Sequence, residues 1–252
     1  MLERNTLLAY LDTLLAKDDF QDYAPNGLQV EGRSQIKKIV TGVTATQALI
    51  ETAIDNNADL LLVHHGFFWR GEDPCVLGMK QRRLKALLQA DLNLAAYHLP
   101  LDVHPTLGNN AQLAQRLGIS TTQSVSAGGT RDLLWLGQLP QAVSAQHFAA
   151  QLEQQLQHTP LLIESSDKMI KTLAWCSGAA QGFISQAATL GADAYLSGEI
   201  SEQTVHIAHE CDIHYFSAGH HATERFGVQA LGSHLAEKYA LEHQFIDIGN
   251  PV

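Results

Sequence analysis

The sequence predicts an α/β fold made of two related lobes, each containing parallel strands. Two segments support this prediction. Residues 37–66, KKIVTGVTATQALIETAIDNNADLLLVHHG, have the pattern of a strand, a turn, an amphipathic helix and a second buried strand, which together form a βαβ unit. Residues 171–199, KTLAWCSGAAQGFISQAATLGADAYLSGE, show the same order of features. The chain is therefore expected to contain the same unit twice.

An internal duplication is indicated by residues that recur at a fixed offset. An offset of 134 pairs Gln47 with Gln181, Ile50 with Ile184, Ala53 with Ala187, Ala58 with Ala192 and Asp59 with Asp193. Beyond these segments, two apolar strands each end at a histidine with a carboxylate four residues later, at an offset of 122: His98 with Asp102, and His220 with Glu224. We expect lobes of residues 1–125 and 126–252, interlocked and divided within the Ser- and Gly-rich stretch 118–129.

The remaining elements are predicted from hydrophobic periodicity. Residues 1–20 form an amphipathic helix with leucines on one face, and residues 81–93, QRRLKALLQADLN, form a helix that leads into a strand. A short helix over 111–117 ends at Gly118, and a helix over 142–158 stops before Pro160.

Composition limits the classes of protein to consider. The 252 residues carry 16 Lys and Arg against 26 Asp and Glu, a net charge of −10, which argues against a protein that binds nucleic acid or anionic membranes. No segment approaches the ~20 apolar residues of a membrane span, and no secretory signal begins the chain, so we expect a cytoplasmic protein. The cysteines, at 75, 176 and 211, are odd in number and show no metal-binding spacing, so we expect them to be reduced.

Histidine is the unusual feature of the composition, with 13 residues. His64 and His65 close the strand LLLV and precede Gly66. In a continuing strand the two rings would point to opposite faces, but where the strand ends both can reach one cleft. The alternative is one surface ring and one core ring bonded to a carbonyl group.

Two further positions carry candidate metal ligands. His220 and Glu224 follow a glycine turn and lie four residues apart, so both reach one side of a helix and could bind one cation. An ordinary helical His–Glu contact is the alternative. Asp102 lies past a strand end and a proline, where an irregular loop can bring its carboxylate into the cleft. Alternatively, it caps the helix near Asn109.

Together these residues favour a metal site at the carboxyl ends of the strands, the edge where open α/β sheets hold ligands. The candidate ligands are His64, His65, Asp102, His220 and Glu224. They suit one or two transition metals, and water held between two cations becomes a nucleophile. Without thiolates, the donors admit zinc, iron, manganese or nickel. Glu199 aligns with His65 and either lines the cleft or is solvated.

Five segments carry a resemblance to a known family: DYAPNGLQVEG, LLVHHGFFW, YHLPLDVHPTLGNN, SGEISEQ and AGHHATERFG. They resemble the GTP cyclohydrolase I type 2 family, also called the NGG-interacting factor three-like family. The resemblance runs nearly end to end and is closest to the short bacterial members, which lack an inserted domain. It implies a two-lobed α/β subunit that assembles into a toroidal homohexamer, with a dinuclear metal centre in each subunit.

The resemblance also implies roles for individual residues. The family's ligands fall on His64, His65, Asp102, His220 and Glu224, and His98 matches a position beside the centre, where it supports the site or carries a proton. The family name implies opening of the guanine ring of GTP, and hydrolysis of damaged nucleotides is another activity suggested for the family.

Two functional hypotheses follow. The first is a metal-dependent hydrolase, in which a metal-bridging water attacks a small polar or nucleotide-derived substrate and His98 moves the proton. The second is a non-catalytic metal-binding scaffold or metallochaperone assembled as a ring. A ring that threads nucleic acid is a third possibility, against which the net charge of −10 argues.

Overall fold

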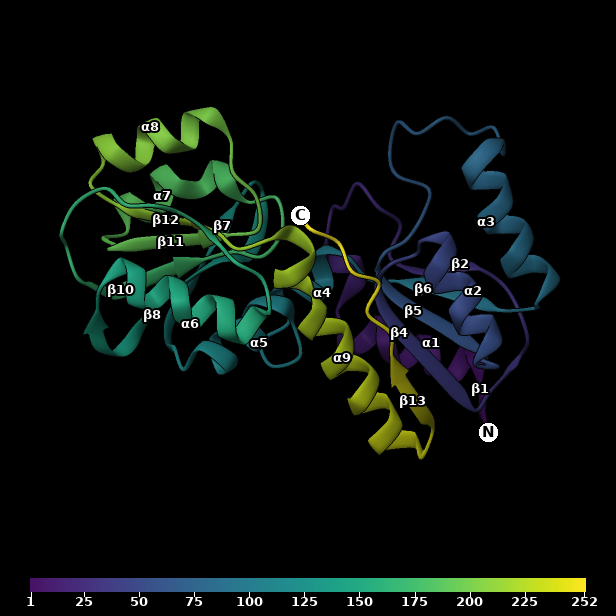
Figure 1. Ribbon diagram of the computed structural model, residues 1–252. Coiled ribbons are helices and arrows are strands. Elements are labelled where there is room, and N and C mark those ends of the chain that lie inside the picture. Colours follow the sequence, from purple (N-terminus) through teal and green to yellow (C-terminus); the bar gives the residue numbers. More distant parts are fainter. The chain divides into compact units, whose positions relative to one another are not determined.

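The computed structural model describes all 252 residues and shows a mixed α/β fold with two compact units (Figure 1). Unit 1 comprises Met1–Gly108 and Gly227–Gly249, and unit 2 comprises Asn109–Phe226 and Asn250–Val252. These bounds differ from the expected lobes of 1–125 and 126–252. The difference arises because residues 109–125 pair and pack within unit 2, whereas the segment from Gly227 returns to unit 1.

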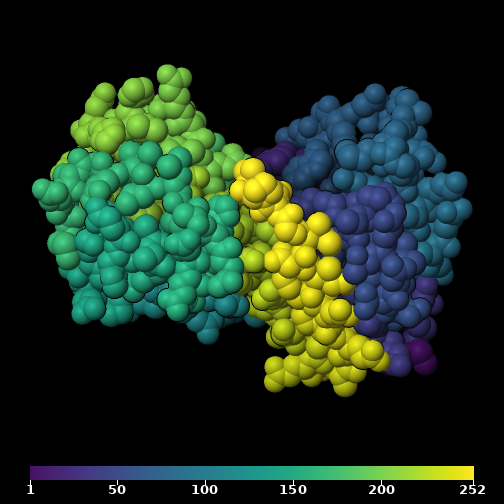
Figure 2. Space-filling model, viewed as in Figure 1, coloured from purple at the N-terminus to yellow at the C-terminus, as the bar shows by residue number.

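The sheet of unit 1 has five strands in the order β13-β4-β5-β6-β2. Their bounds are β2 Gly27–Val30, β4 Lys38–Thr44, β5 Leu60–His65, β6 Asn93–Ala96 and β13 Glu242–Phe245. All neighbours are parallel except β2 and β6. A separate antiparallel pair joins β1 (Leu2–Glu3) to β3 (Gln35–Ile36). In Figure 2 the yellow C-terminal segment lies along blue-violet residues of unit 1, as the pairing of β13 with β4 requires.

Apolar residues cover both faces of this sheet, because successive strand residues point to opposite sides. Val40 and Leu61 pack on the side of α2 (Gln47–Asp55) and α3 (Gly78–Gln89). Ile39 and Leu60 pack on the other side, with α1 (Arg4–Leu14) and the later part of α9 (His220–Tyr239). Strand β5 is therefore buried on both faces, which explains its uninterrupted apolar sequence.

The sheet of unit 2 has six strands in the order β7-β8-β10-β11-β12-β9. The bounds are β7 Ser120–Ala127, β8 Thr130–Val143, β9 Leu161–Ile163, β10 Ile170–Trp175, β11 Ala194–Ser197 and β12 His214–Ser217. Only β10, β11 and β12 are mutually parallel. The helices are α5 (Asn109–Leu117), α6 (Ala145–Leu156), α7 (Ile184–Thr189), α8 (Glu202–Glu210) and the first residues of α9. Trp175, Phe148 and Phe216 are the largest fully buried side chains of this core.

The two sheets share a four-stranded arrangement. In unit 1, β4, β5 and β6 are parallel and the preceding strand β2 pairs antiparallel with β6; in unit 2, β9 takes the same place beside β12. The register also agrees, since Ile39 pairs with Leu60 and Leu173 pairs with Ala194, at the offset of 134 found in the sequence.

Equivalent aspartates make equivalent hydrogen bonds in the two units. Asp59 Oδ2 accepts from the backbone N–H groups of Lys37 and Lys38, at 2.8 and 2.9 Å. Asp193 Oδ2 accepts from the N–H groups of Lys171 and Thr172, at 3.0 and 2.8 Å. Each aspartate precedes the second parallel strand and binds the start of the first. Each aspartate therefore helps to set the register between the two parallel strands.

Two local features differ from what the sequence alone indicated. Residues 120–127, which lie in the stretch where we expected the lobes to divide, form strand β7 and pair with β8. Most of this strand is exposed, so its sequence is polar and lacks the apolar pattern that predicts a strand. Asp102 was expected on an irregular loop but lies on the short helix α4 (Leu99–Val103). Pro100 lies in the first turn of this helix, where proline is tolerated.

None of the helices is both long and apolar enough to cross a membrane. Cys75, Cys176 and Cys211 are all free thiols.

Replacing Asp193 with alanine is expected to lower the free energy of unfolding by about 1–3 kcal/mol, because two backbone N–H groups lose their acceptor. Asp59→Ala should cost a similar amount for the same reason. Urea unfolding measures the effect, with Asp167→Ala as a control that removes an exposed carboxylate. Equal stability of the Asp193→Ala and Asp167→Ala variants would contradict the role given to this carboxylate.

Candidate metal site

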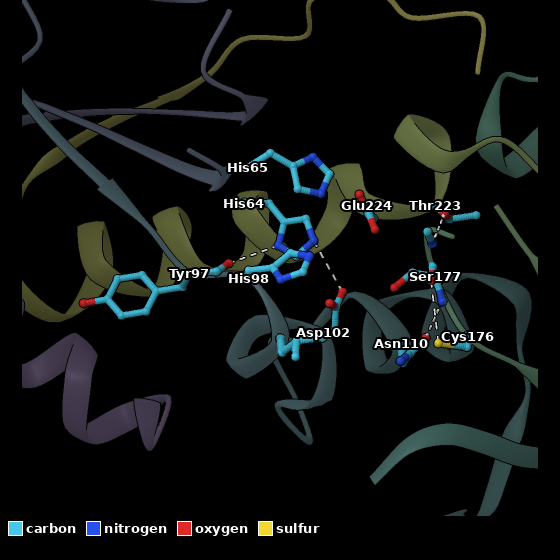
Figure 3. A network of polar contacts seen from close by, with 12 residues as sticks. His64, His65, Tyr97, His98, Asp102, Asn110, Cys176, Ser177, Thr223 and Glu224 are labelled. Atoms are coloured by element: carbon cyan, nitrogen blue, oxygen red, sulfur yellow. Dashed lines mark hydrogen bonds and ion pairs between the residues drawn. The ribbon is translucent and has the colours of Figure 1, made fainter. Parts of the chain in front are cut away.

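Three imidazoles gather where strands β5 and β6 of unit 1 end (Figure 3). The ring centroids lie 4.5 Å apart for His64 and His65, 5.1 Å for His64 and His98, and 5.6 Å for His65 and His98. Each of the three rings offers a nitrogen within 4.8 Å of the other two. The rings of the consecutive residues His64 and His65 therefore lie close together at the strand end, as their position in the sequence indicated.

His64 is fully buried, and its tautomer follows from its hydrogen bond. Its Nδ1 lies 3.0 Å from the backbone oxygen of Tyr97. Because a carbonyl oxygen only accepts, Nδ1 must carry a proton, and Nε2 is the ring nitrogen that can bind a cation. That Nε2 lies 3.5 Å from Asp102 Oδ1, so an imidazole nitrogen and a carboxylate oxygen face the same point.

Asp102 is held by helix α4, which follows directly from the end of β6. The backbone N–H groups of Leu101 and Asp102 both donate to the carbonyl of His98, at 2.8 and 3.2 Å. The side chain of Asp102 is buried. This single helical turn therefore fixes the carboxylate beside the histidines.

His65 is supported from the neighbouring strand. Its Nδ1 lies 3.1 Å from the hydroxyl oxygen of Thr44, and the two residues are directly paired in the register of β4 and β5. With Nδ1 engaged by the hydroxyl, Nε2 is the nitrogen available to a cation. Thr44 therefore orients His65 through side chains that the sheet itself brings together.

His98 is held by the buried carboxylate of Asp22, which was not among the candidate residues although it begins the segment DYAPNGLQVEG. Asp22 lies 3.0 and 3.2 Å from His98 Nδ1 through its two oxygens, and it also accepts from the N–H of Leu99. Asn26 Oδ1 accepts from the N–H of His98 at 2.7 Å. Burial alone would raise the pKa of Asp22, but the hydrogen bond and charge of His98, with the Asn26 amide, lower it to about 2. Asp22 is therefore ionised and fixes the proton on Nδ1 of His98.

Unit 2 contributes a second group at the ends of β11 and β12. His220 begins helix α9, and its Nε2 lies 3.1 Å from Glu224 Oε2, as their spacing of four residues requires. Its Nδ1 lies 2.7 Å from Glu199 Oε1. Glu224 is buried, whereas the side chain of Glu199 is about a third exposed.

A glycine makes room for the Glu224 carboxylate. Gly178 has φ +67°, and a Cβ atom there would lie 2.2 Å from Glu224 Oε1 and 3.3 Å from His220 Nε2. Its N–H donates to the hydroxyl of Thr223, which in turn donates to the carbonyl of His220. The turn after β10 is therefore shaped around the first turn of α9.

The two carboxylates determine the protonation of His220 in the metal-free protein. Burial by itself would lower its pKa, but Glu224 and then Glu199 raise it to about 9 through hydrogen bonds and charge. A cation that binds at Nε2 therefore replaces a proton there.

The sequence-predicted residues thus form two groups, one on each unit. His64, His65, His98 and Asp102 come together in unit 1, and His220 comes together with Glu224 in unit 2. Imidazole nitrogens and carboxylate oxygens are donors that suit zinc, iron, manganese and nickel, so the residues present fit the expected metals. Asp22 and Thr44 were missed, and Glu199 was left open between two interpretations.

The fold and these donor groups define an α/β protein with a candidate metal-binding cluster of histidine and carboxylate side chains. Residues 2–251 match the family described as Duf34/NIF3 (NGG1p interacting factor 3). The chain belongs to this family, as the resemblance in its sequence indicated.

Relatives of known sequence and structure support the assignment along the whole chain. A Pseudomonas aeruginosa protein called "GTP cyclohydrolase 1 type 2 homolog" is 53% identical over 247 residues, 98% of each chain. A Haemophilus influenzae protein of the same name is 53% identical over 94% of each chain. The solved structure of protein ybgI, described as of unknown function, has 46% identity and a TM-score of 0.96 with full coverage of both chains. That of TTHA1606 from Thermus thermophilus has 34% identity and a TM-score of 0.90, also with full coverage.

In protein stripped of metal, His220 is expected to titrate near pH 9. Because this pKa lies above the ordinary value of 6.5, protonated His220 stabilises the metal-free fold. The stabilisation is complete below pH 6.5 and is lost as the pH rises through about 9. NMR titration of histidine side chains measures the pKa, and Glu224→Gln should lower it. A pKa of 6.5 or below in the wild-type protein would contradict the expectation.

Proposed function

We propose that this protein is a dinuclear metal-dependent hydrolase that acts on a small polar or nucleotide-derived substrate, with damaged nucleotides among the candidates. The observation that carries the proposal is the arrangement of imidazoles in unit 1, where acceptors hold Nδ1 of His64 and His98 as donors and Nε2 is left for other partners. The name of the relatives, "GTP cyclohydrolase 1 type 2 homolog", is consistent with a hydrolytic reaction on a nucleotide.

The proposed ligands are those expected from the strand ends: His64, His65, Asp102, His220 and Glu224. We propose that they hold two divalent cations per subunit, drawn from zinc, iron, manganese and nickel. When bound, such cations polarise a scissile group and activate water at neutral pH. Tyr97, Thr44 and Glu199 support the proposal because each lies against Nδ1 of one ligand histidine.

His98 is proposed to carry the proton of the reaction. The ionised Asp22 accepts from Nδ1, so Nε2 is the atom that takes or releases a proton. The hydroxyl of Tyr23 lies 3.5 Å from this Nε2, and the side chain of Tyr23 is exposed, which gives the proton a route toward solvent.

The architecture around the site is also proposed. The shared strand order, the offset of 134 in register and the matching bonds of Asp59 and Asp193 support an origin of two related lobes by internal duplication. The family relationship supports assembly into a toroidal homohexamer, which light scattering would report as the mass of six chains.

The ligand assignment predicts that His64→Ala and Glu224→Ala each lose bound metal while the fold survives. Each variant removes one donor from the proposed centre, and neither side chain belongs to the main apolar clusters. Elemental analysis after dialysis measures the metal, and circular dichroism measures the fold. His206→Ala, which removes an exposed histidine of helix α8, is the matched control. Wild-type metal content in both ligand variants would overturn the site assignment.

The role of His98 predicts that His98→Gln lowers turnover about 10²–10⁴-fold, the usual contribution of a proton-transferring side chain, while metal content stays at the wild-type level. The assay uses metal-loaded protein and a panel of nucleotides, oxidised nucleotides, esters and amides. Turnover by no member of the panel, together with rapid release of metal to an apo-protein, would favour the metallochaperone instead.

A further inference from the structure

We propose that Glu199 is a positioning residue of the metal centre, which holds the imidazole of His220 so that its Nε2 faces the cation. This inference rests on the proposed function, because it assumes that His220 is a ligand. It assigns a role to a carboxylate that the sequence left open between a cleft position and simple solvation.

Glu199 accepts a short hydrogen bond from the imidazole of His220. Glu199 Oε1 lies 2.7 Å from His220 Nδ1, which is shorter than the corresponding contacts of His64 and His65. A carboxylate only accepts, so Nδ1 must carry a proton and Nε2 must be the atom that binds a metal. Ligand histidines in metalloproteins commonly donate their second N–H to such a carboxylate, which fixes the ring and raises its basicity.

Glu199 is itself held in place by hydrogen bonds. Its backbone carbonyl accepts hydrogen bonds from the hydroxyl groups of Ser197 and Tyr215, both buried in the core of unit 2. Its other carboxylate oxygen, Oε2, lies 3.5 Å from Gln181 Nε2. The carboxylate is thus anchored at the end of β11.

The backbone at Gly198 approaches the backbone at His220 closely. A Cβ atom on Gly198 would lie 2.6 Å from the Cα of His220 and 2.8 Å from the carbonyl of Gly178. The N–H of Gly219 also donates to the carbonyl of Gly198 at 3.0 Å. Glycine at position 198 lets the end of β11 lie against the start of α9, which brings Glu199 to the imidazole.

Unit 1 also contains a histidine whose Nδ1 contacts a carboxylate. His98 aligns with His220 in the internal repeat, and Asp22 holds its Nδ1 at 3.0 Å. Asp22 comes from the loop before β2, whereas Glu199 comes from the end of β11. Two carboxylates from different positions in the chain therefore make the same contact with the aligned histidines.

The test measures the affinity of the whole protein for Zn²⁺ by competition with a chelator. Glu199→Ala is expected to weaken binding of one Zn²⁺ ion by about ten- to a hundredfold, the usual effect of removing such a supporting group. Glu199→Gln keeps an acceptor oxygen without the charge and should weaken binding less. Glu202→Gln removes a charge from the exposed first turn of α8 and should bind as the wild type does.

A second readout reports on orientation rather than on stability. In Zn²⁺-loaded wild-type protein labelled with ¹⁵N-histidine, the Nδ1–H signal of His220, identified by its loss in His220→Ala, should be protected from exchange with solvent. In Glu199→Ala it should exchange rapidly, and in Glu199→Gln it should be partly protected. If Glu199→Ala does not fold, Glu199→Gln decides through both readouts.

The outcomes separate the two proposals. If Glu199→Ala binds Zn²⁺ within about twofold of the wild type and keeps a protected Nδ1–H, the role of Glu199 is refuted even though Glu224→Ala loses metal. If the wild-type protein retains no metal and Glu224→Ala behaves identically, the metal centre fails and the role of Glu199 fails with it.

Discussion

The candidate centre depends on how Nδ1 of each imidazole is held. The partners of Nδ1 differ in chemistry: a backbone carbonyl for His64, a hydroxyl for His65, and carboxylates for His98 and His220. In each case the contact involves Nδ1, and Nε2 is the other ring nitrogen. A histidine side chain rotates about two bonds, so without these contacts a cation would have to order each ligand ring on binding. The partners supply that order in advance.

The strands make this arrangement possible because parallel neighbours end at one edge. Asp59 and Asp193 tie the start of the second parallel strand to the start of the first in each unit. The register set there reaches the far end of the sheet, where Thr44 pairs with His65. An error of one residue at the start would turn every side chain of β5 to the opposite face, and His64 and His65 would exchange places.

The sequence was sufficient to predict the parts that depend on local pattern. The βαβ units, the helical spacing of His220 and Glu224, and the strand end at His65 all follow from periodicity within a few residues. The family was also evident from five short segments. Strand β7 was not predictable, because its residues are mostly exposed and polar and its place in the sheet depends on pairing with β8.

The supporting residues escaped prediction for a different reason. Asp22 and His98 are 76 residues apart, and nothing in the spacing of a carboxylate and an imidazole at that distance indicates contact. The tautomer of His64 depends on the backbone carbonyl of Tyr97, a group that every residue carries and that no sequence pattern distinguishes. Such contacts become visible only once the sheet has set the strand ends side by side.

The proposed internal duplication would let one position of the repeat take two different roles at the candidate site. His65 and Glu199 align at the offset of 134. His65 is the last residue of β5, and Glu199 follows the end of β11 by two residues. At this position the first half presents an imidazole to the site, whereas the second half presents a carboxylate to His220. The difference at this one position gives His220 a charged support, whereas His64 and His65 contact neutral oxygens, so the imidazoles proposed as ligands differ in basicity.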